Sequence, residues 1–189
     1  NYGQDSTFAG TETAASNSDA NGLGEFSQTV PSGYKALCSA NLPDPTIGPG
    51  QSSQSDDNFN TVLWSGDGSS SRGITGVGFQ PDWVWIKTRN QTNEHSLFDS
   101  VRGAAKDLEA NDTDAEQANN VNGYINSFDS DGFTVVDGSS GGALVNYSSG
   151  GTTNTYVSWN WKAGGSASSN SNGSITSNVS ANTDAGFSI

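Results

Sequence analysis

The sequence predicts an all-β protein, a β-sandwich or jelly-roll built from short antiparallel strands. Ser, Thr, Asn, Asp and Gly dominate the composition, with 24 glycines among 189 residues, which suits many turns and disfavours helical bundles. Apolar and aromatic residues recur at period two in several short stretches, as strands require. Two of these stretches, one near the middle of the chain and one near its end, carry the same W-x-W pattern.

The two W-x-W stretches predict partner strands at the centre of the sandwich, at residues 83–88 and 155–162. The alternation places Trp83 and Trp85 on one face of the first strand, and Val84 and Ile86 on the other. Because both faces are apolar, we expect this strand to be covered on both sides. Pro81 cannot donate to a strand ladder, so it belongs at the junction before the strand.

The remaining elements follow in chain order from the same alternation. Residues 1–7 resemble the end of a strand, and 35–39 predict a short one, before a Pro-rich stretch at 42–55 that predicts an extended boundary. Further strands are expected at 59–65, 74–79, 96–99, 124–128, 133–136 and 143–147, and the pair at 124–136 predicts a hairpin with an Asp-Gly turn. Residues 101–110 fit either a helix or a twisted edge strand. Strand patterns recur at 175–179 and 185–189.

These elements predict four regions. Residues 1–41 are expected to be the C-terminal strand and extended arm of a preceding sandwich domain, and 42–58 a linker. Residues 59–165 are expected to form the main β-sandwich domain, and 166–189 a linker with the first strand of a following repeat. The chain starts at Asn1 rather than Met and ends in a strand pattern, so we expect it to be cut from a longer protein at both ends.

The net charge of −13, with a pI near 4.1, excludes several classes of partner. An acidic surface repels phosphate backbones and anionic membranes, so we expect no nucleic-acid binding. No apolar run approaches the roughly 20 residues that a membrane span needs, so no membrane insertion is expected. Cys38 is the only cysteine, which leaves no intrachain disulfide and no thiolate metal site.

Aromatic residues give the first candidate site. Stacked aromatic rings hold sugar rings in many β-sandwich modules, and the five Trp residues could build such a glycan platform: Trp64, Trp83, Trp85, Trp159 and Trp161. Trp64, Trp83 and Tyr147 are the preferred candidates. The alternative is that Trp residues flanked by Val and Ile are core residues, each burying a large area.

A second candidate is a calcium loop at residues 129–132, where Asp129 and Asp131 alternate as hard oxygen ligands. The stretch lacks the later ligands and the terminal Glu of an EF-hand. Asp side chains that accept hydrogen bonds from their own turn are the preferred explanation of the pattern. We therefore expect no cofactor, with Ca²⁺ as the one alternative.

No catalytic residue is expected. His95 is the only histidine, and residues 138–142 match G-x-S-x-G without the strand-to-helix setting of a nucleophile elbow. Carboxylate pairs for glycoside hydrolysis remain open, since the chain has 20 acidic residues. Most of these lie in polar turn clusters.

Several separated motifs carry a resemblance to a known family. They are the stretches at residues 34–43 (YKALCSANLP), 59–64 (FNTVLW), 73–82 (GITGVGFQPD), 98–104 (FDSVRGA) and 159–165 (WNWKAGG). Together they resemble a β-rich domain that recurs in large virion proteins of marine tailed phages, similar to tail-fibre-like or capsid-appendage proteins. The resemblance covers about residues 34–189. In such proteins a SPRY-like or concanavalin-like sandwich often precedes this domain and a related repeat often follows.

The resemblance implies a non-enzymatic virion structural protein, extracellular and displayed on the particle in a fibre or appendage used in host attachment. We expect identical copies in a trimer or array, contacts with other virion proteins, and a host surface glycan as a further partner. A carbohydrate-binding module is the alternative, and a glycan-cleaving spike enzyme a third reading. Trp64 or Trp83 exposed in a groove favours the carbohydrate-binding module, and two carboxylates facing across a groove favour the enzyme.

Overall fold

The computed structural model describes residues 11, 13 and 15–189, which divide into two compact units, Asn1–Pro45 and Thr46–Ile189. The division falls within the stretch that the sequence predicts as a linker, residues 42–58. The strand end predicted at residues 1–7 lies outside the described residues. Each unit is described by itself below.

The carboxylate of Asp19 organises the first unit. It accepts hydrogen bonds from the backbone N–H groups of Ala36, at 2.8 Å, and Leu23, at 2.9 Å, and from the side-chain amide of Asn41, at 2.6 Å. These bonds, led by that of Ala36, lower the pKa of Asp19 to about 2. The strand predicted at 35–39 is wrong, because the chain bends here and enters the 3₁₀ turn η1 (Ser39–Asn41).

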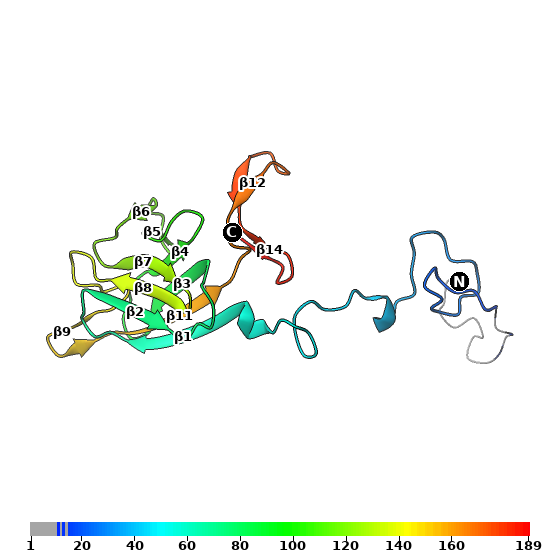
Figure 1. The fold of residues 1–189 in the computed structure, drawn as a ribbon, viewed down its shortest axis with the longest axis horizontal. Coiled ribbons are helices and arrows are strands. Elements are labelled where there is room, and N and C mark those ends of the chain that lie inside the picture. Colours follow the sequence, from blue (N-terminus) through cyan, green and yellow to red (C-terminus); the bar gives the residue numbers. More distant parts are fainter. Residues whose placement is uncertain (1–10, 12, 14) are drawn as a thin grey trace. The chain divides into compact units, whose positions relative to one another are not determined.

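The second unit is the predicted all-β sandwich (Figure 1). Its larger sheet has the strand order β1-β11-β3-β4-β5-β6, and its smaller sheet the order β2-β8-β7, and both sheets are antiparallel. The larger sheet contains β1 (Phe59–Ser65), β3 (Trp83–Thr88), β4 (His95–Asp99), β5 (Lys106–Glu109), β6 (Gln117–Ala118) and β11 (Thr155–Trp161). The smaller contains β2 (Ser71–Thr75), β7 (Tyr124–Asp129) and β8 (Gly132–Val136).

The two W-x-W strands are neighbours, as predicted. Strand β11 lies between β1 and β3, and its register places Trp159 opposite Trp85 and Trp161 opposite Trp83. Residues directly opposite one another in an antiparallel pair share a face of the sheet. All four Trp side chains therefore lie on the same face.

The core lies between the two sheets. The inward positions of the large sheet include Val84, Ile86, Phe98 and Tyr156, and each is at most 1% exposed. They form one cluster with side chains of the smaller sheet and its loops: Ile74, Val77, Phe79, Ile125, Phe133, Val135, Leu144 and Val145. Most of the large buried side chains belong to this layer.

The strand predicted at 74–79 ends early. Strand β2 stops at Thr75, and Gly76 and Gly78 follow with φ of +90° and +88°, a conformation that glycine adopts without steric cost. The carboxylate of Asp131 accepts hydrogen bonds from both glycine N–H groups, at 3.1 and 2.7 Å. The loop thereby keeps Val77 and Phe79 buried without strand pairing.

Residues 143–147 form a turn rather than the predicted strand. Gly141 and Gly142 precede them at positive φ, and the N–H groups of Val145 and Asn146 both donate to Gly142 O. The stretch is apolar because Leu144 and Val145 fill the end of the core. Its short apolar run does not distinguish a buried strand from a buried turn.

The ambiguous stretch at 101–110 contains a turn followed by β5, so the strand alternative holds and the helix does not, although β6 and not β5 forms the edge of the sheet. Strand β6 lies in a stretch for which the sequence pattern predicts no strand. A short hairpin of β9 (Ser148–Ser149) and β10 (Thr152–Thr153) precedes β11, and the 3₁₀ turn η2 (Ser55–Asp57) precedes β1. No helix in the described part of the chain is long and apolar enough to cross a membrane.

The C-terminal residues form two small hairpins, drawn in orange and red in Figure 1. The first pairs β12 (Ser168–Asn170) with β13 (Ser177–Val179), and the second pairs β14 (Ala181–Asn182) with β15 (Phe187–Ser188). The sequence predicts strand patterns in this region but assigns it to a linker and a following repeat. The second hairpin contacts the sandwich, where the side-chain amide of Asn182 donates to Lys162 O at 3.1 Å.

Candidate functional site

The outward side of the large sheet carries a row of aromatic side chains, which we call the aromatic face: Phe59, Trp83, Trp85, Trp159 and Trp161. They alternate along β1, β3 and β11 with the core residues of the inward side. The four Trp side chains are half-buried and Phe59 is exposed. The expectation that β3 is covered on both sides holds for its inward side, whereas the outward side is half-buried and is covered by the C-terminal hairpin only at Trp83.

One end of the aromatic face is covered by the C-terminal hairpin. Phe187 stacks on Trp83, with ring centroids 5.8 Å apart, and on Trp161, at 6.1 Å. Trp83 and Trp161 stack on each other at 4.6 Å, and Phe59 packs against Trp161 at 4.9 Å. These four rings form one cluster drawn from four strands.

The other end of the aromatic face lacks such a cover. Trp85 and Trp159 lie with ring centroids 5.5 Å apart and planes inclined by 58°. The indole N–H of Trp85 donates to Nδ1 of His95 at 3.0 Å, so Nδ1 is the unprotonated nitrogen. Burial, and then the positive charge of Lys87, lower the pKa of His95. The imidazole is therefore neutral at pH 7 and lines the face as a polar but uncharged group.

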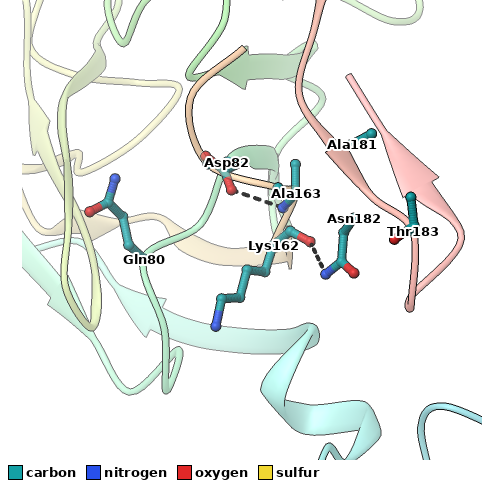
Figure 2. Close-up of a pocket in the computed structure, with 9 residues that line it drawn as sticks. Gln80, Asp82, Lys162, Ala163, Ala181, Asn182 and Thr183 are labelled. Atoms are coloured by element: carbon teal, nitrogen blue, oxygen red, sulfur yellow. Dashed lines mark hydrogen bonds between the residues drawn. The ribbon is translucent and has the colours of Figure 1, made fainter. Parts of the chain in front are cut away.

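A cleft of about 550 Å³ lies beside the covered end, between the start of β3, the chain after β11 and the C-terminal hairpin (Figure 2). Asp82 is buried at its edge and accepts hydrogen bonds from Ala163 N and Ser100 Oγ, both at 2.8 Å. The polar side chains that line the cleft include Gln80, Lys162, Asn182 and Thr183. It is an open hollow with a mixed polar and apolar lining, and its one carboxylate already accepts hydrogen bonds from the protein.

A buried carboxyl group lies on the inward side of β5. Asp107 is 1% exposed, and its Oδ2 accepts a hydrogen bond from the side-chain amide of Asn120 at 3.0 Å. Burial raises the pKa of Asp107 to about 6, against the effect of the Asn120 amide, and the charge of Glu109 raises it further. Asp107 Oδ1 and the nearby Ser96 Oγ have no hydrogen-bond partner among the described residues.

The three residues predicted as a glycan platform do not lie together. Trp64 is on the inward side of β1, 8% exposed, with its indole N–H donating to Val145 O at 2.8 Å and its ring stacked on Tyr156. Trp83 is on the aromatic face. Tyr147 is half-buried in the loop before β9, where its backbone N–H donates to the hydroxyl of Tyr156. Trp64 therefore belongs to the core.

The two predicted calcium ligands are engaged by different groups of the protein. Asp131 accepts from the glycine N–H groups of the loop after β2. Asp129 accepts from Ser127 Oγ at 2.9 Å and Thr134 Oγ1 at 2.8 Å, across the β7–β8 hairpin. Among the residues described, no group of three or more His, Cys, Asp or Glu side chains is arranged to hold a metal ion.

Trp85 and Trp159 are not among the preferred candidates from the sequence, and Phe187 is not a candidate at all. The alternation within each W-x-W strand contains the signal for the first two, because it places both Trp residues of a strand on one side. Phe187 has no comparable local signal. Its contact with Trp83 depends on how the C-terminal hairpin folds back.

Comparison with known proteins gives one match. A family model described as "Domain of unknown function (DUF7483)" matches residues 54–189. No match was found among curated proteins or among solved structures. The matched segment includes the sandwich, the aromatic face and both C-terminal hairpins.

Proposed function

The chain belongs to the DUF7483 family, and we propose that it is a non-enzymatic structural module whose aromatic face packs against identical copies. The resemblance of residues 34–189 to virion domains supports a setting on the surface of a tailed-phage particle. There the module is part of an extracellular fibre or capsid appendage that takes part in host attachment and contacts other virion proteins.

The observation that carries the proposal is the packing of the C-terminal hairpin on the aromatic face. Phe187 shows that this face accepts an aromatic side chain from a β-hairpin at its covered end. Trp85, Trp159 and Leu97 continue the same face beyond the hairpin and are only half-buried. An apolar surface continuous with an existing protein contact favours a further protein element as its occupant.

The charge distribution favours an identical copy as that occupant. The chain carries 20 acidic residues against 7 Lys and Arg, so most pairs of its surfaces repel each other. The outward positions of β1, β3, β4 and β11 include Lys87 and only one carboxylate, Asp99. Arg102 forms an ion pair with Asp99 at 2.5 Å. Two copies can therefore bring these faces together without opposing uncompensated carboxylates.

The carboxylates near the aromatic face also support a non-enzymatic role. Asp82 and Asp99 are each held by hydrogen bonds from the protein. A glycosidase needs two carboxyl groups that face the same sugar across a cleft. Asp82 is the only acidic residue lining the cleft of Figure 2.

Glycan binding is the second candidate, and one observation favours it. The half-exposed rings of Trp85 and Trp159 lie beside Lys87 and the neutral His95. An apolar ring face flanked by polar groups suits a sugar, which presents C–H groups on one side and hydroxyls at its edge. This candidate uses the open end of the aromatic face rather than Trp64.

The test measures self-association and sugar binding of the full chain together. Sedimentation velocity over a range of concentrations is expected to show assemblies that shrink in the double variant Trp85→Ala/Trp159→Ala, with at least a tenfold weaker association. Ile175→Ala, at an exposed apolar position of the C-terminal segment, is the matched control and is expected to change nothing.

Unchanged assembly in the double variant contradicts the proposal. Tryptophan quenching by oligosaccharides, lost in the same double variant, instead supports the glycan candidate. Electron cryomicroscopy of the particle that carries the chain tests the virion setting, where ordered copies with buried Trp85 are expected and a single isolated copy contradicts it.

A further inference from the structure

Strand β1 is an edge of the large sheet with one free side. It pairs along its whole length with β11 and has no strand on its other side in the described chain. Figure 1 shows it in cyan along the border of the sandwich. With seven residues, it is a long edge, and such an edge presents backbone groups to any strand that can pair with it.

Two hydrogen bonds that flank β1 identify the backbone groups that face outward. Gly66 N donates to Asn154 O, and Lys162 N donates to Asn58 O. In this register, even-numbered residues of β1 bond to β11, because bonded and non-bonded pairs alternate in an antiparallel ladder. The N–H and C=O groups of Phe59, Thr61, Leu63 and Ser65 therefore point to the free side.

Two of the outward groups have local partners. Thr61 N–H donates to the side-chain oxygen of Asn60 at 2.8 Å, and Arg72 donates to Ser65 O at 2.6 Å. The first bond joins adjacent residues, and a pairing strand replaces it with a backbone hydrogen bond from Thr61 N–H. The second closes the edge at its C-terminal end, so the pairing surface runs from Phe59 to Leu63.

The strand lacks the residues by which natural edges avoid pairing. Residues 59–65 read FNTVLWS, without Pro or a charged residue, whereas protected edges carry Lys, Pro or a bulge. Its apolar side chains on the outward face are exposed, Phe59 by 39% and Leu63 by 59%. Pairing along this edge would bury both.

We propose that β1 is an isologous interface, at which β1 of a second copy of this chain pairs antiparallel about a two-fold axis at Thr61. Thr61 then lies opposite Thr61 of the second copy, and each Phe59 lies opposite a Leu63. These are the hydrogen-bonded positions of the new ladder, because their backbone groups are the ones that face outward. The inference rests on the proposed function, since it names a surface at which the identical copies join.

The pattern of the edge favours a second copy over an unrelated strand, because the exposed apolar residues Phe59 and Leu63 lie two residues either side of Thr61 and so face each other about a two-fold axis. In this register the end of one β1 meets the beginning of the other. Asp56 and Asp57, exposed in the turn before β1, then lie near the end of β1 of the second copy, where Arg72 donates to Ser65 O and pairs with its own Asp67 at 3.4 Å. A two-fold axis creates this arrangement twice.

The pairing also continues the aromatic face across the seam. Phe59 already packs against Trp161 at 4.9 Å, so a Leu63 placed beside Phe59 extends the same apolar row into the second copy. The result is one sheet of two copies with a shared outward face. An edge interface of this kind, together with packing of the aromatic face, gives each copy two different contacts and hence a regular array.

The experiment uses charges at the position that lies on the axis. The background is the full chain with Trp85→Ala/Trp159→Ala, in which packing of the aromatic face is removed and the edge contact remains. Dimers are expected by sedimentation, and Thr61→Lys or Thr61→Glu alone is expected to weaken them at least tenfold, because like charges oppose each other. Mixing the Lys and Glu variants is expected to restore dimers.

A cysteine cross-link tests the register. Directly opposite residues of a hydrogen-bonded pair have Cα atoms about 5.5 Å apart, within the range of a disulfide. Thr61→Cys in a Cys38→Ser chain is expected to form covalent dimers on oxidation. Thr75→Cys, exposed at the end of β2, is the control and is expected to remain monomeric.

The outcomes separate the two proposals. Monomers in the Trp-substituted background, or dimers that Thr61→Lys leaves unchanged, overturn the edge pairing even when the wild-type chain assembles through its aromatic face. Loss of association with Thr61→Lys, but not with the Trp substitutions, supports the edge pairing and contradicts the role of the aromatic face. Restoration by mixing, with cross-linking at position 61, supports the two-fold axis at Thr61.

Discussion

Phe187 lies almost parallel to Trp83, with ring planes 11° apart and centroids separated by 5.8 Å. The first ring comes from the last hairpin of the chain and the second from a central strand of the large sheet. The contact therefore joins the short C-terminal hairpin to the larger of the two sheets. It also determines how much of the aromatic face stays open.

Phe187→Ala is expected to release the C-terminal hairpin. The hairpin has only two residues in each strand, and an isolated hairpin is marginal in water, so it depends on the aromatic contact. Such ring pairs contribute on the order of 1 kcal/mol beyond their buried area. Hydrogen exchange of residues 181–189 is expected to accelerate, and tryptophan emission to shift to longer wavelength. Unchanged exchange contradicts the dependence, and Ile175→Ala is the control.

Gly164→Ala is expected to displace the same hairpin without removing a ring. A Cβ at this position lies 1.9 Å from Ala181 O, which is backbone and cannot move alone. The hairpin must therefore shift, and the stacking of Phe187 is lost with it. The same exchange and emission changes are expected as for Phe187→Ala. Gly173→Ala meets nothing closer than 3.8 Å, and an equal response in that variant contradicts the steric account.

Trp64 and Trp85 are expected to respond very differently to truncation. Trp64 is buried with its N–H bonded to Val145 O, so Trp64→Ala leaves a large cavity and an unpaired carbonyl. Its cost is expected to be about 3–5 kcal/mol of the free energy of unfolding. Trp85 faces outward and is half-buried, so Trp85→Ala should cost less than half as much. Urea denaturation of both variants measures this, and equal losses contradict the assignment of the two faces.

The sequence predicts the centre of this fold well because the signal there is local. Strands β1 and β3 have the predicted bounds, and the W-x-W strands pair as expected. Because large side chains alternate along the stretch, a strand is the conformation that buries Val84 and Ile86 together on one side. The all-β class follows from these elements.

The errors occur where tertiary contacts determine the backbone. Residues 143–147 are apolar because they close the end of the core, and glycines before them set a turn that no periodicity reveals. The stretch at 74–79 is divided by Asp131, which is distant in sequence. The candidate site depends in the same way on Phe187, whose partner is set by the folding back of the hairpin. Trp64 lies on the inward side of the sheet, and its own strand pattern does not show whether that side is the core or the surface. The strands that pack against it decide this.

The raised pKa of the buried Asp107 predicts that the free energy of unfolding depends on pH. Burial raises its folded-state pKa to about 6, from an ordinary value of 3.8. The folded state therefore favours the neutral acid, and this stabilisation is fully present below pH 3.8 and is lost as pH rises through 6. The shift of about two pKa units corresponds to at most about 3 kcal/mol. Wild-type protein is expected to lose part of its unfolding free energy between pH 4 and 8.

Asp107→Asn is expected to remove this loss, because a neutral amide keeps an acceptor for Asn120 and carries no charge to bury. At pH 8 the variant should be more stable than the wild type, while at pH 4 the difference disappears or reverses. Urea denaturation at both pH values measures it, with Asp112→Asn, an exposed position, as the control for a change in net charge. Glu109 is the ionised neighbour that adds to the shift, so Glu109→Gln should weaken the pH dependence without abolishing it. The assignment of Asp107 as a buried neutral acid is contradicted if the unfolding free energies of the wild type and of Asp107→Asn change by the same amount between pH 4 and pH 8.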